Sequence, residues 1–445
     1  MRIVDWRVMD EAARSDVLAR PRIERDGDLV DGVRRIVADV RAHGDSALAD
    51  LTERLDGCRL ERFSVSEAEF MDAEARVDDS VRAAMSSAIA RVGDFHRAQL
   101  PRRLRVQTAP GVICELLVRP IHCVGLYAPA GSAPLPSTVW MLAVPALLAG
   151  CREIVLATPP GASGRAAPLI LVAARLCGIK RVIKLGGAQA IAAMAYGTQT
   201  IPKCDKVFGP GNAWVMQAKL EVAGDPEGCA IDLPAGPSEV MVIADGDADP
   251  VFVAADLLAQ AEHGPDSQVV LVTPSDTLIE AVMTECRDQL ADLPRAVTAS
   301  SALAHARLIR VQDLSQAVAI AERYAPEHLI IQAREPRALL PGITTAGSVF
   351  LGPWSPETVG DYCAGPNHVL PTSGFARAYS GVGVASFQRR MSVQALDAEG
   401  LRRIGPEAAL LARAECLEGH ARAVDLRLAR IDQLRRTGAD TGVAA

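Results

Sequence analysis

The chain has 445 residues, of which 49% are hydrophobic, so it is long enough to form two or more domains with buried cores. Its formal net charge is -7 and no polybasic segment is present, so nucleic acid is not an expected partner. The longest apolar stretch, 139–150, is too short to span a bilayer, and the N-terminus has no apolar signal region. None of the 10 cysteines forms a Cys-x-x-Cys pair, which argues against a disulfide framework and a thiolate zinc site. We therefore expect a cytoplasmic protein with no membrane partner.

The first hundred residues carry a helical pattern. Apolar residues recur at helical spacing over 29–55, which predicts a helix there. A second helical stretch runs to about residue 100 and begins at a capping box, formed by either Ser64 with Glu67 or Ser66 with Glu69.

From about residue 112, short apolar runs alternate with helical ones. This alternation predicts an α/β fold whose parallel sheets are covered by helices on both faces, with enough strands for two such units. The first unit has predicted strands at 124–127, 153–157, 181–185 and 206–208, and helices at 137–148, 166–176 and 188–195. The second unit has predicted strands at 239–244, 268–273, 307–311, 328–332 and 348–351, and helices at 250–263, 277–290 and 314–324.

The segment after about residue 393 is helical and rich in arginine and glutamate. Its apolar stripe is thin, so it is difficult to bury inside one compact domain. We expect an arm that reaches onto a second subunit.

The pair Glu327-His328 joins two proton-transfer side chains at the start of an apolar strand. Histidine titrates near neutral pH, where a general base works best. Neighbouring residues of a regular strand point to opposite faces, so the pair can share a cleft only where the backbone is irregular. Pro326 favours such an irregularity. The alternative is a solvated glutamate beside a half-buried histidine.

Metal-binding side chains occur at two places. Gln260 and His263 lie three residues apart at the end of the predicted helix 250–263, and therefore on one face of it. Asp361 and His368 lie in the Gly- and Pro-rich segment 360–368, which we expect to be neither helix nor strand. Imidazole and carboxylate ligands suit zinc or a similar divalent ion, although His263 could equally be a surface residue.

Three glycine-containing turns, 125–132, 186–189 and 209–212, each follow a predicted strand. Glycine lets a ligand approach the backbone, and the following helix N-terminus attracts phosphate. Each turn alone is also what an ordinary strand-to-helix connection looks like. Three together favour a ligand site at the C-terminal edge of a parallel sheet.

Longer motifs extend these local patterns: GPGN at 209–212, DLPAGPSE at 232–239, QAEHGPDSQ at 260–268, PEHL at 326–329 and NHVLPT at 367–372. In their order and approximate spacing they resemble the histidinol dehydrogenase family, over nearly the whole chain from about Ile3 to Arg436. The resemblance implies two incomplete Rossmann-like domains, a helical N-terminal segment and a C-terminal helical arm in an intertwined homodimer. The implied bounds are 1–28 for the N-terminal segment, 29–128 with 239–380 for the first Rossmann-like domain, 129–238 for the second, NAD-binding domain, and 381–445 for the arm.

The same resemblance implies an activity. The family carries out the last two oxidations of histidine biosynthesis, from L-histidinol through L-histidinal to L-histidine, with two NAD used in succession. Zinc would hold the imidazole and amine nitrogens of histidinol. His328 would remove the hydroxyl proton as hydride leaves, Glu327 would activate the water that adds to the aldehyde, and His328 would assist the second hydride transfer.

Residue roles are implied position by position. The catalytic pair is Glu327 and His328, and the ligands of one zinc per subunit are Gln260, His263, Asp361 and His420. Further substrate contacts are Ser238, His368 and Glu415, and cofactor contacts are Tyr127, Gln189 and Asn212. His420 and Glu415 would come from the partner subunit. Of the two residues in the segment 360–368, Asp361 would be the metal ligand and His368 the substrate contact. Ala130 stands where the family usually has a second glycine.

Three other functions are compatible with part of this pattern. A related zinc- and NAD-dependent dehydrogenase of another small alcohol, such as a sulfonated diol, could share the metal site and the pair, but the joint presence of Ser238, His368 and Glu415 argues against it. A zinc hydrolase with Glu327 as its base would not require the glycine-rich turns. A catalytically silent binding protein would be expected to have lost at least one of these side chains.

Overall fold

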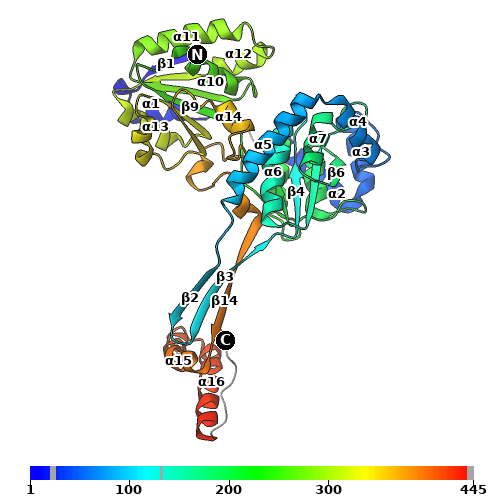
Figure 1. Cartoon of the computed structure of the whole chain (residues 1–445), viewed down its shortest axis with the longest axis vertical. Coiled ribbons are helices and arrows are strands. Elements are labelled where there is room, and N and C mark those ends of the chain that lie inside the picture. The colour runs from blue at the N-terminus through cyan, green and yellow to red at the C-terminus, as the bar shows by residue number, and fades with distance from the viewer. Residues whose placement is uncertain (21–26, 131–133, 438–445) are drawn as a thin grey trace. The chain divides into compact units, whose positions relative to one another are not determined.

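The computed structural model describes residues 1–20, 27–130 and 134–437. Contacts within the chain divide it into two units (Figure 1). The first unit comprises Met1–Gln99 and Ile121–Phe387, and the second comprises Leu100–Pro120 and the chain from Gln388 onward. The architecture is α/β, as the alternating pattern predicts.

One sheet of the first unit has six strands in the order β1-β11-β10-β9-β12-β13, and neighbouring strands pair in parallel. Alternate residues of its strands enter two separate cores, as expected for a sheet covered on both faces. Helices α10, α11 and α12 fill one core, and α1 and α13 fill the other. The strands are β1 Arg2–Asp5, β9 Glu239–Ala244, β10 Gln268–Thr273, β11 Arg307–Arg310, β12 His328–Gln332 and β13 Ser348–Leu351. The helices are α1 Glu11–Leu18, α10 Pro250–Ala261, α11 Asp276–Leu290, α12 Ala296–Ala304, α13 Leu314–Tyr324 and α14 Glu357–Tyr362.

The other sheet of the first unit has five parallel strands in the order β6-β5-β4-β7-β8. The strands are β4 Cys123–Tyr127, β5 Glu153–Thr158, β6 Arg181–Lys184, β7 Lys206–Phe208 and β8 Ala230–Ile231. Helices α4–α7 share one core with it, and α2, α3, α8 and α9 share the other. These helices are α2 Gly27–His43, α3 Asp45–Asp56, α4 Glu67–Arg76, α5 Asp79–Arg97, α6 Pro136–Ala149, α7 Pro168–Leu176, α8 Gly187–Tyr196 and α9 Ala213–Ala223.

The place of helices α2–α5 corrects one predicted boundary. Residues 29–128 were expected to belong with 239–380, but α2 buries Val33 and Ile36 in the same core as Val155 and Ile183 of the five-stranded sheet. A helical apolar stripe shows that a helix covers something, but it does not identify which sheet is covered. The other predicted domain bounds stay predictions.

The second unit contains a three-stranded antiparallel sheet in the order β14-β3-β2, followed by the helices α15 and α16, which contact each other. Its elements are β2 Leu104–Ala109, β3 Val112–Pro120, β14 Gln388–Leu396, α15 Ala398–Ala414 and α16 Glu418–Thr437. The segment 381–445 is predicted to form a helical arm, and the strand β14 at its start is a correction. The expected helical segment 1–28 likewise begins with the strand β1.

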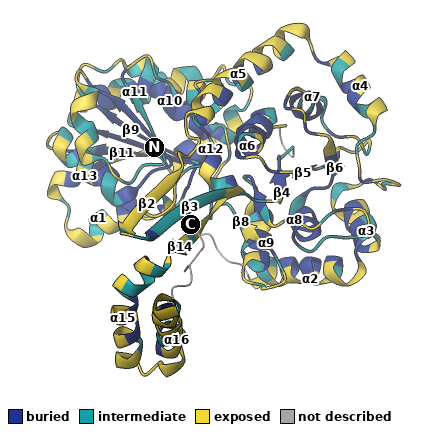
Figure 2. Ribbon diagram, turned by 60° about the horizontal axis from the view of Figure 1, so that its bottom comes forward, coloured by how far each residue is buried: buried dark blue, intermediate teal, exposed yellow. Residues whose placement is uncertain are grey.

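Several predicted elements are confirmed at their predicted bounds. The predicted strands 239–244, 268–273, 328–332 and 348–351 coincide with β9, β10, β12 and β13. The capping box uses Ser66 with Glu69 rather than Ser64 with Glu67, and it starts α4. Figure 2 shows the central strands β9 and β11 of the six-stranded sheet buried and the outer faces of the helices exposed. Within the described part of the chain, no helix is long and apolar enough to cross a membrane.

The described residues also form short 3-10 helices: η1 Trp6–Val8, η2 Pro336–Gly342, η3 Phe375–Arg377 and η4 Val384–Phe387.

Candidate active site

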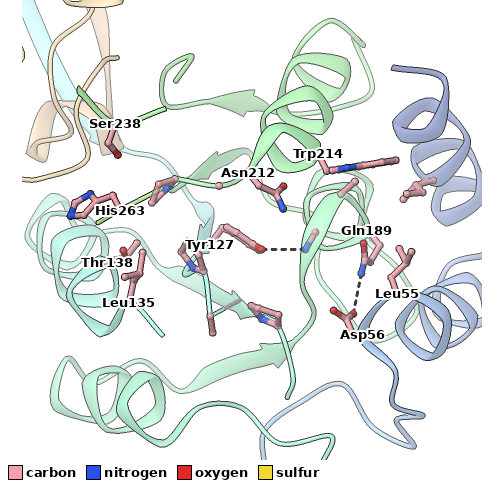
Figure 3. A pocket seen from close by; sticks show the side chains of 18 of the residues that line it. Leu55, Asp56, Tyr127, Leu135, Thr138, Gln189, Asn212, Trp214, Ser238 and His263 are labelled. Carbon is pink, nitrogen blue, oxygen red and sulfur yellow. Dashed lines mark hydrogen bonds between the residues drawn. The ribbon is translucent and has the colours of Figure 1, made fainter. Parts of the chain in front are cut away.

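The described residues of the first unit line a large cavity of about 1220 Å³, whose walls come from both of its sheets. Ser238 and His263 lie on one side of it, while Gln189 and Asp56 lie on the opposite side (Figure 3). The wall near His263 also contains Glu327, His328, Asp361 and His368. The cavity thus brings together most of the side chains that the sequence singles out.

The two sheets contribute opposite edges to this cavity. The five-stranded sheet contributes its carboxyl edge, since Tyr127 ends β4 and Gly187 and Pro210 follow β6 and β7. The six-stranded sheet contributes its amino edge, since Ser238 directly precedes β9 and His328 begins β12. The expectation that ligands gather at carboxyl edges therefore fits the first of these sheets only.

Glu327 and His328 share the cavity because the backbone before β12 is irregular. Ala325 adopts a left-handed conformation with φ of 54° where α13 ends, and Pro326 follows it. Regular pairing starts only at His328. Both members of the pair are buried, with Glu327 6% and His328 3% exposed.

The backbone of Glu239 holds both side chains of the pair. Its N–H donates to Glu327 Oε2 at 2.9 Å, and its carbonyl oxygen lies 3.1 Å from His328 Nδ1. Because a carbonyl oxygen can only accept, Nδ1 carries the proton, and the free lone pair is on Nε2. That Nε2 atom is buried without a hydrogen-bond partner among the described residues, 3.5 Å from Asp361 Oδ1. The geometry thus leaves one imidazole nitrogen available as a base.

Several acidic groups surround this imidazole. Burial raises the pKa of Glu327 to about 7, although the nearby His328 works in the opposite direction. Burial also raises the pKa of Glu357 to about 8. Burial alone would lower the pKa of His328, but Glu357, Glu327 and Asp361 together raise it well above its ordinary value. Protons can therefore be exchanged near neutral pH in this part of the cavity.

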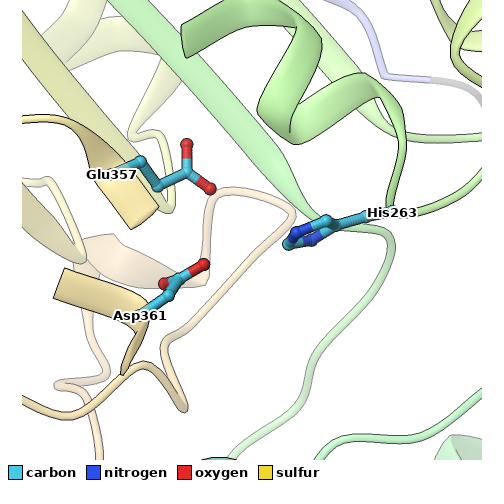
Figure 4. A group of neighbouring side chains, drawn as sticks. All are labelled: His263, Glu357 and Asp361. Carbon is cyan, nitrogen blue, oxygen red and sulfur yellow. The ribbon is translucent and has the colours of Figure 1, made fainter. Parts of the chain in front are cut away.

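A metal-binding group of side chains adjoins the pair. His263, Glu357 and Asp361 each offer a ligand atom, and these atoms all lie within 4.8 Å of one another (Figure 4). Gln260 is fully buried beside them, with its side-chain amide 3.2 Å from His263 Nδ1. Three of the four predicted ligands, Gln260, His263 and Asp361, are thus neighbours.

The sequence pattern of 360–368 predicts a loop, but this prediction is wrong for Asp361. It belongs to α14, where Glu357 precedes it by four residues and shares its face of the helix. Gly360 is compatible with this helix, and glycine is required there because a Cβ would collide with the ring of Phe350. The segment from Cys363 to His368 does lack regular structure.

His368 lines the cavity with its Nδ1 2.8 Å from the backbone oxygen of Asp361. Since that oxygen accepts, the proton is on Nδ1 and the Nε2 lone pair of His368 is free. Burial lowers the pKa of His368, which keeps this imidazole neutral.

The far side of the cavity is built from the three glycine-containing turns. The Tyr127 hydroxyl accepts from the Gly187 N–H at 3.2 Å, and Asn212 Oδ1 caps α9 by accepting from the Val215 N–H at 3.1 Å. Gln189 Nε2 donates to Asp56 Oδ2 at 3.2 Å, while Gln189 Oε1 is buried with no partner in the described part of the chain (Figure 3). Polar atoms thus remain available in this wall.

Two details concern the backbone of the turns. Gly209 has a φ of 124° and passes so close to the backbone of Tyr127 that a Cβ would collide with it. Ala130 is not among the described residues with positive φ, so alanine is tolerated there. Residues 131 and 132 of the first turn lie outside the described residues.

Comparison with known proteins identifies the family. A sequence profile named Histidinol dehydrogenase matches residues 19–428. The chain belongs to the histidinol dehydrogenase family. Histidinol dehydrogenase of Xanthomonas euvesicatoria pv. vesicatoria is 60% identical over 96% of this chain and 99% of its own, and that of Xylella fastidiosa strain 9a5c is 56% identical with the same coverage. The crystal structure of histidinol dehydrogenase from Elizabethkingia anophelis matches with a TM-score of 0.94 at 43% identity, covering 97% of this chain and 99% of that one.

Two residues implied by the histidinol dehydrogenase resemblance lie in the second unit. Glu415 follows α15, His420 lies in the first turns of α16, and both are exposed. Cys416, with φ of 60°, separates the two helices, so Glu415 and His420 do not share one regular helix. Their part in the site stays a prediction.

Sequence reasoning missed two residues of the cavity region. Glu357 could have been found from its spacing of four before Asp361, had 360–368 not been assigned to a loop. Asp56 ends α3 and reaches Gln189, but nothing in a solvent-facing helical pattern indicates that a helix end lines a site.

Proposed function

We propose that this protein oxidises L-histidinol through L-histidinal to L-histidine, the last two steps of histidine biosynthesis, with zinc and NAD as cofactors. The observation that carries the proposal is the single cavity in which Glu327 and His328, the metal-binding group and the three glycine-containing turns meet. The alternative substrate, a sulfonated diol, is not favoured by the family to which the chain belongs.

The residues present fit both cofactors. The metal-binding group supplies an imidazole and two carboxylates, and Gln260 beside it supplies an amide oxygen. Glu357 Oε2 is buried without a hydrogen-bond partner in the described ranges. Gln260, His263 and Asp361 would hold the ion, and Tyr127, Gln189 and Asn212 would contact NAD. When bound, zinc orients the substrate nitrogens and NAD accepts hydride in each oxidation.

His328 acts on the substrate proton in both oxidations. Its Nε2 lone pair takes the hydroxyl proton of histidinol as hydride leaves, which gives histidinal. The carbonyl of Glu239 keeps Nδ1 protonated and so keeps Nε2 available. A divalent cation bound at Asp361 would offset the charge of that carboxylate and so counter its part in the raised pKa of His328.

Glu327 acts between the two oxidations. It deprotonates the water that adds to the histidinal carbonyl, while the protonated His328 returns its proton to the carbonyl oxygen. His328 then takes a hydroxyl proton of this hydrate as the second hydride leaves. A carboxylate with a pKa near 7 is well matched to this task. The buried position of the pair keeps the aldehyde away from bulk water between the steps.

Substrate contacts complete the proposal. Ser238 and His368 line the cavity and would bind the substrate from this subunit. Glu415 and the metal ligand His420 would come from the partner of a homodimer, with one zinc in each shared site. We expect such an enzyme in the cytoplasm.

The activity test measures NADH formation from histidinol by zinc-loaded protein. The proposal predicts two NADH for each histidinol, one from each oxidation, and no NADH from a sulfonated diol. Absence of NADH from metal-loaded protein contradicts the assignment. His328→Ala is expected to abolish turnover and leave zinc content near normal, and loss of the metal would contradict its role as a base.

The shared site is tested by mixing two inactive variants, His263→Ala and His420→Ala. A mixed dimer contains one site with both ligands intact if His420 crosses from the partner. Recovered activity supports the shared site, and failure to recover any activity contradicts it.

A further inference from the structure

Glu357 is a buried carboxylate to which the mechanism assigns no role. It is 2% exposed, and Glu357 Oε1 lies 3.5 Å from His328 Nδ1. An acidic group in so dry a position destabilises the fold unless it binds something, and Glu357 Oε2 has no hydrogen-bond partner in the described chain. A specific function at this place is therefore indicated.

The partner that identifies this function is the side-chain amide of Gln260. In one orientation, Gln260 Nε2 donates to Glu357 Oε1 at 3.1 Å and to the carbonyl oxygen of Glu239 at 3.2 Å, and Gln260 Oε1 accepts from His263 Nδ1 at 3.2 Å. In the reverse orientation, Gln260 Oε1 would face the Glu239 carbonyl, which cannot donate, and Glu357 Oε1, which cannot donate when the carboxylate is ionised. Glu357 and the Glu239 carbonyl together therefore decide which end of the amide faces His263.

That choice matters for metal binding because only the oxygen of an amide is a ligand. The nitrogen has no available lone pair, and a reversed Gln260 would present N–H groups toward the ion. Resting on the proposed function, we propose that Glu357 is a positioning residue that holds the Gln260 nitrogen and thereby presents the Gln260 oxygen to the metal site. It acts on the metal through Gln260.

The test separates this role from the charge of Glu357. Glu357→Gln and Glu357→Leu both remove the negative charge, but only the glutamine retains an oxygen that accepts from Gln260. Zinc affinity is measured by competition with a chromophoric chelator, and the cobalt-substituted proteins are compared by their visible absorption spectra. We expect Glu357→Leu to bind zinc about 10- to 100-fold more weakly than Glu357→Gln, the usual range for removal of an outer-sphere partner.

The same two variants are then made in a Gln260→Leu background. If Glu357 acts through Gln260, the difference in zinc affinity between Glu357→Gln and Glu357→Leu disappears there. A difference that persists without Gln260, or equal affinities of the two variants in the natural background, overturns the inference. In the latter case the charge or direct ligation, and not the orientation of Gln260, determines the role of Glu357.

The control is Asp256→Asn. It removes a different buried carboxylate, which lies on α10, the helix that carries Gln260. Asp256 accepts from Gln332 Nε2 at 2.6 Å and is not one of the metal-binding group. Its loss is expected to leave zinc affinity within about threefold, and a larger decrease overturns the specificity claimed for Glu357. If the unmodified protein binds no zinc, the proposed function fails, which is a different result from equal binding by the two Glu357 variants.

Discussion

Asp256 offers a test of the buried electrostatics around the site that does not depend on activity. Its side chain is buried, and burial raises its pKa to about 6, although the hydrogen bond from Gln332 works in the opposite direction. Gln332 Oε1 is buried beside it with no partner among described residues. Asp256→Asn removes the charge and keeps an oxygen that accepts from Gln332 Nε2. It also adds an N–H group that can donate to Gln332 Oε1. We therefore expect the substitution to stabilise the fold.

The magnitude follows from proton linkage. The pKa of Asp256 is higher in the folded protein than its ordinary value of 3.8, so stability from this group is complete below about pH 4 and is lost as pH rises through about 6. A difference of about two pKa units corresponds to roughly 3 kcal/mol at full ionisation. The asparagine escapes this loss. Its gain in unfolding free energy should grow from roughly 1.5 kcal/mol at pH 5 to roughly 3 kcal/mol at pH 8.

The assay is urea unfolding of both proteins at the two pH values, followed by tryptophan fluorescence. Asp288→Asn on the exposed face of α11 serves as the control and should change stability by less than about 0.5 kcal/mol at either pH. A gain for Asp256→Asn that is equal at both pH values would refute the electrostatic reasoning. Destabilisation at pH 8 would show that the carboxylate is stabilised by its surroundings.

Three further outcomes are expected. Glu327→Gln should stop after the first hydride transfer and release little histidine. In single-turnover NADH measurements its second oxidation should be about 10²- to 10⁴-fold slower. An equal slowing of both oxidations would contradict the role of Glu327 in activating water. Gly360→Ala should displace α14, lowering thermal stability by about 1–3 kcal/mol together with zinc affinity. The control Gly93→Ala, where a Cβ meets only the Arg97 side chain at 3.8 Å, should lower neither. Tyr127→Phe removes the acceptor of the first N–H of α8 and should weaken NAD binding several-fold in a fluorescence titration, with little change in kcat; unchanged NAD affinity would exclude Tyr127 from the cofactor wall.

The sequence predicts the buried strands well because a strand covered on both faces is a continuous apolar run. The runs that became β9, β10, β12 and β13 have no polar interruption, and their bounds are predicted to the residue. The strands β2, β3 and β14 were missed because their residues are mostly exposed or half-buried and mixed in polarity. Antiparallel strands open to solvent leave a much weaker pattern than buried parallel ones.

The site was partly predictable for a similar reason. Glu327 and His328 are adjacent in sequence, and Gln260 and His263 are three apart, so local spacing brings each pair together. Nothing local shows that Glu239 binds both Glu327 and His328, because its backbone does so and every residue other than proline has the same backbone groups. Such contacts depend on strand register, which the sequence pattern does not specify.

The use of opposite sheet edges gives the two sides of the cavity opposite electrostatic character. In an α/β unit the helices run antiparallel to the strands, so helix N-termini gather at the carboxyl edge and helix C-termini at the amino edge. The partial charge at a helix N-terminus is positive and favours phosphate, whereas the charge at a C-terminus is negative and favours a cation. At the carboxyl edge of the five-stranded sheet, α8 and α9 begin at Gly187 and Ala213. At the amino edge of the six-stranded sheet, α10 ends at Ala261, between Gln260 and His263. A dinucleotide pyrophosphate at the first edge and a divalent ion at the second would each meet the helix ends that suit its charge, and a reversal of either sheet would place the ligand at that sheet against the wrong dipole.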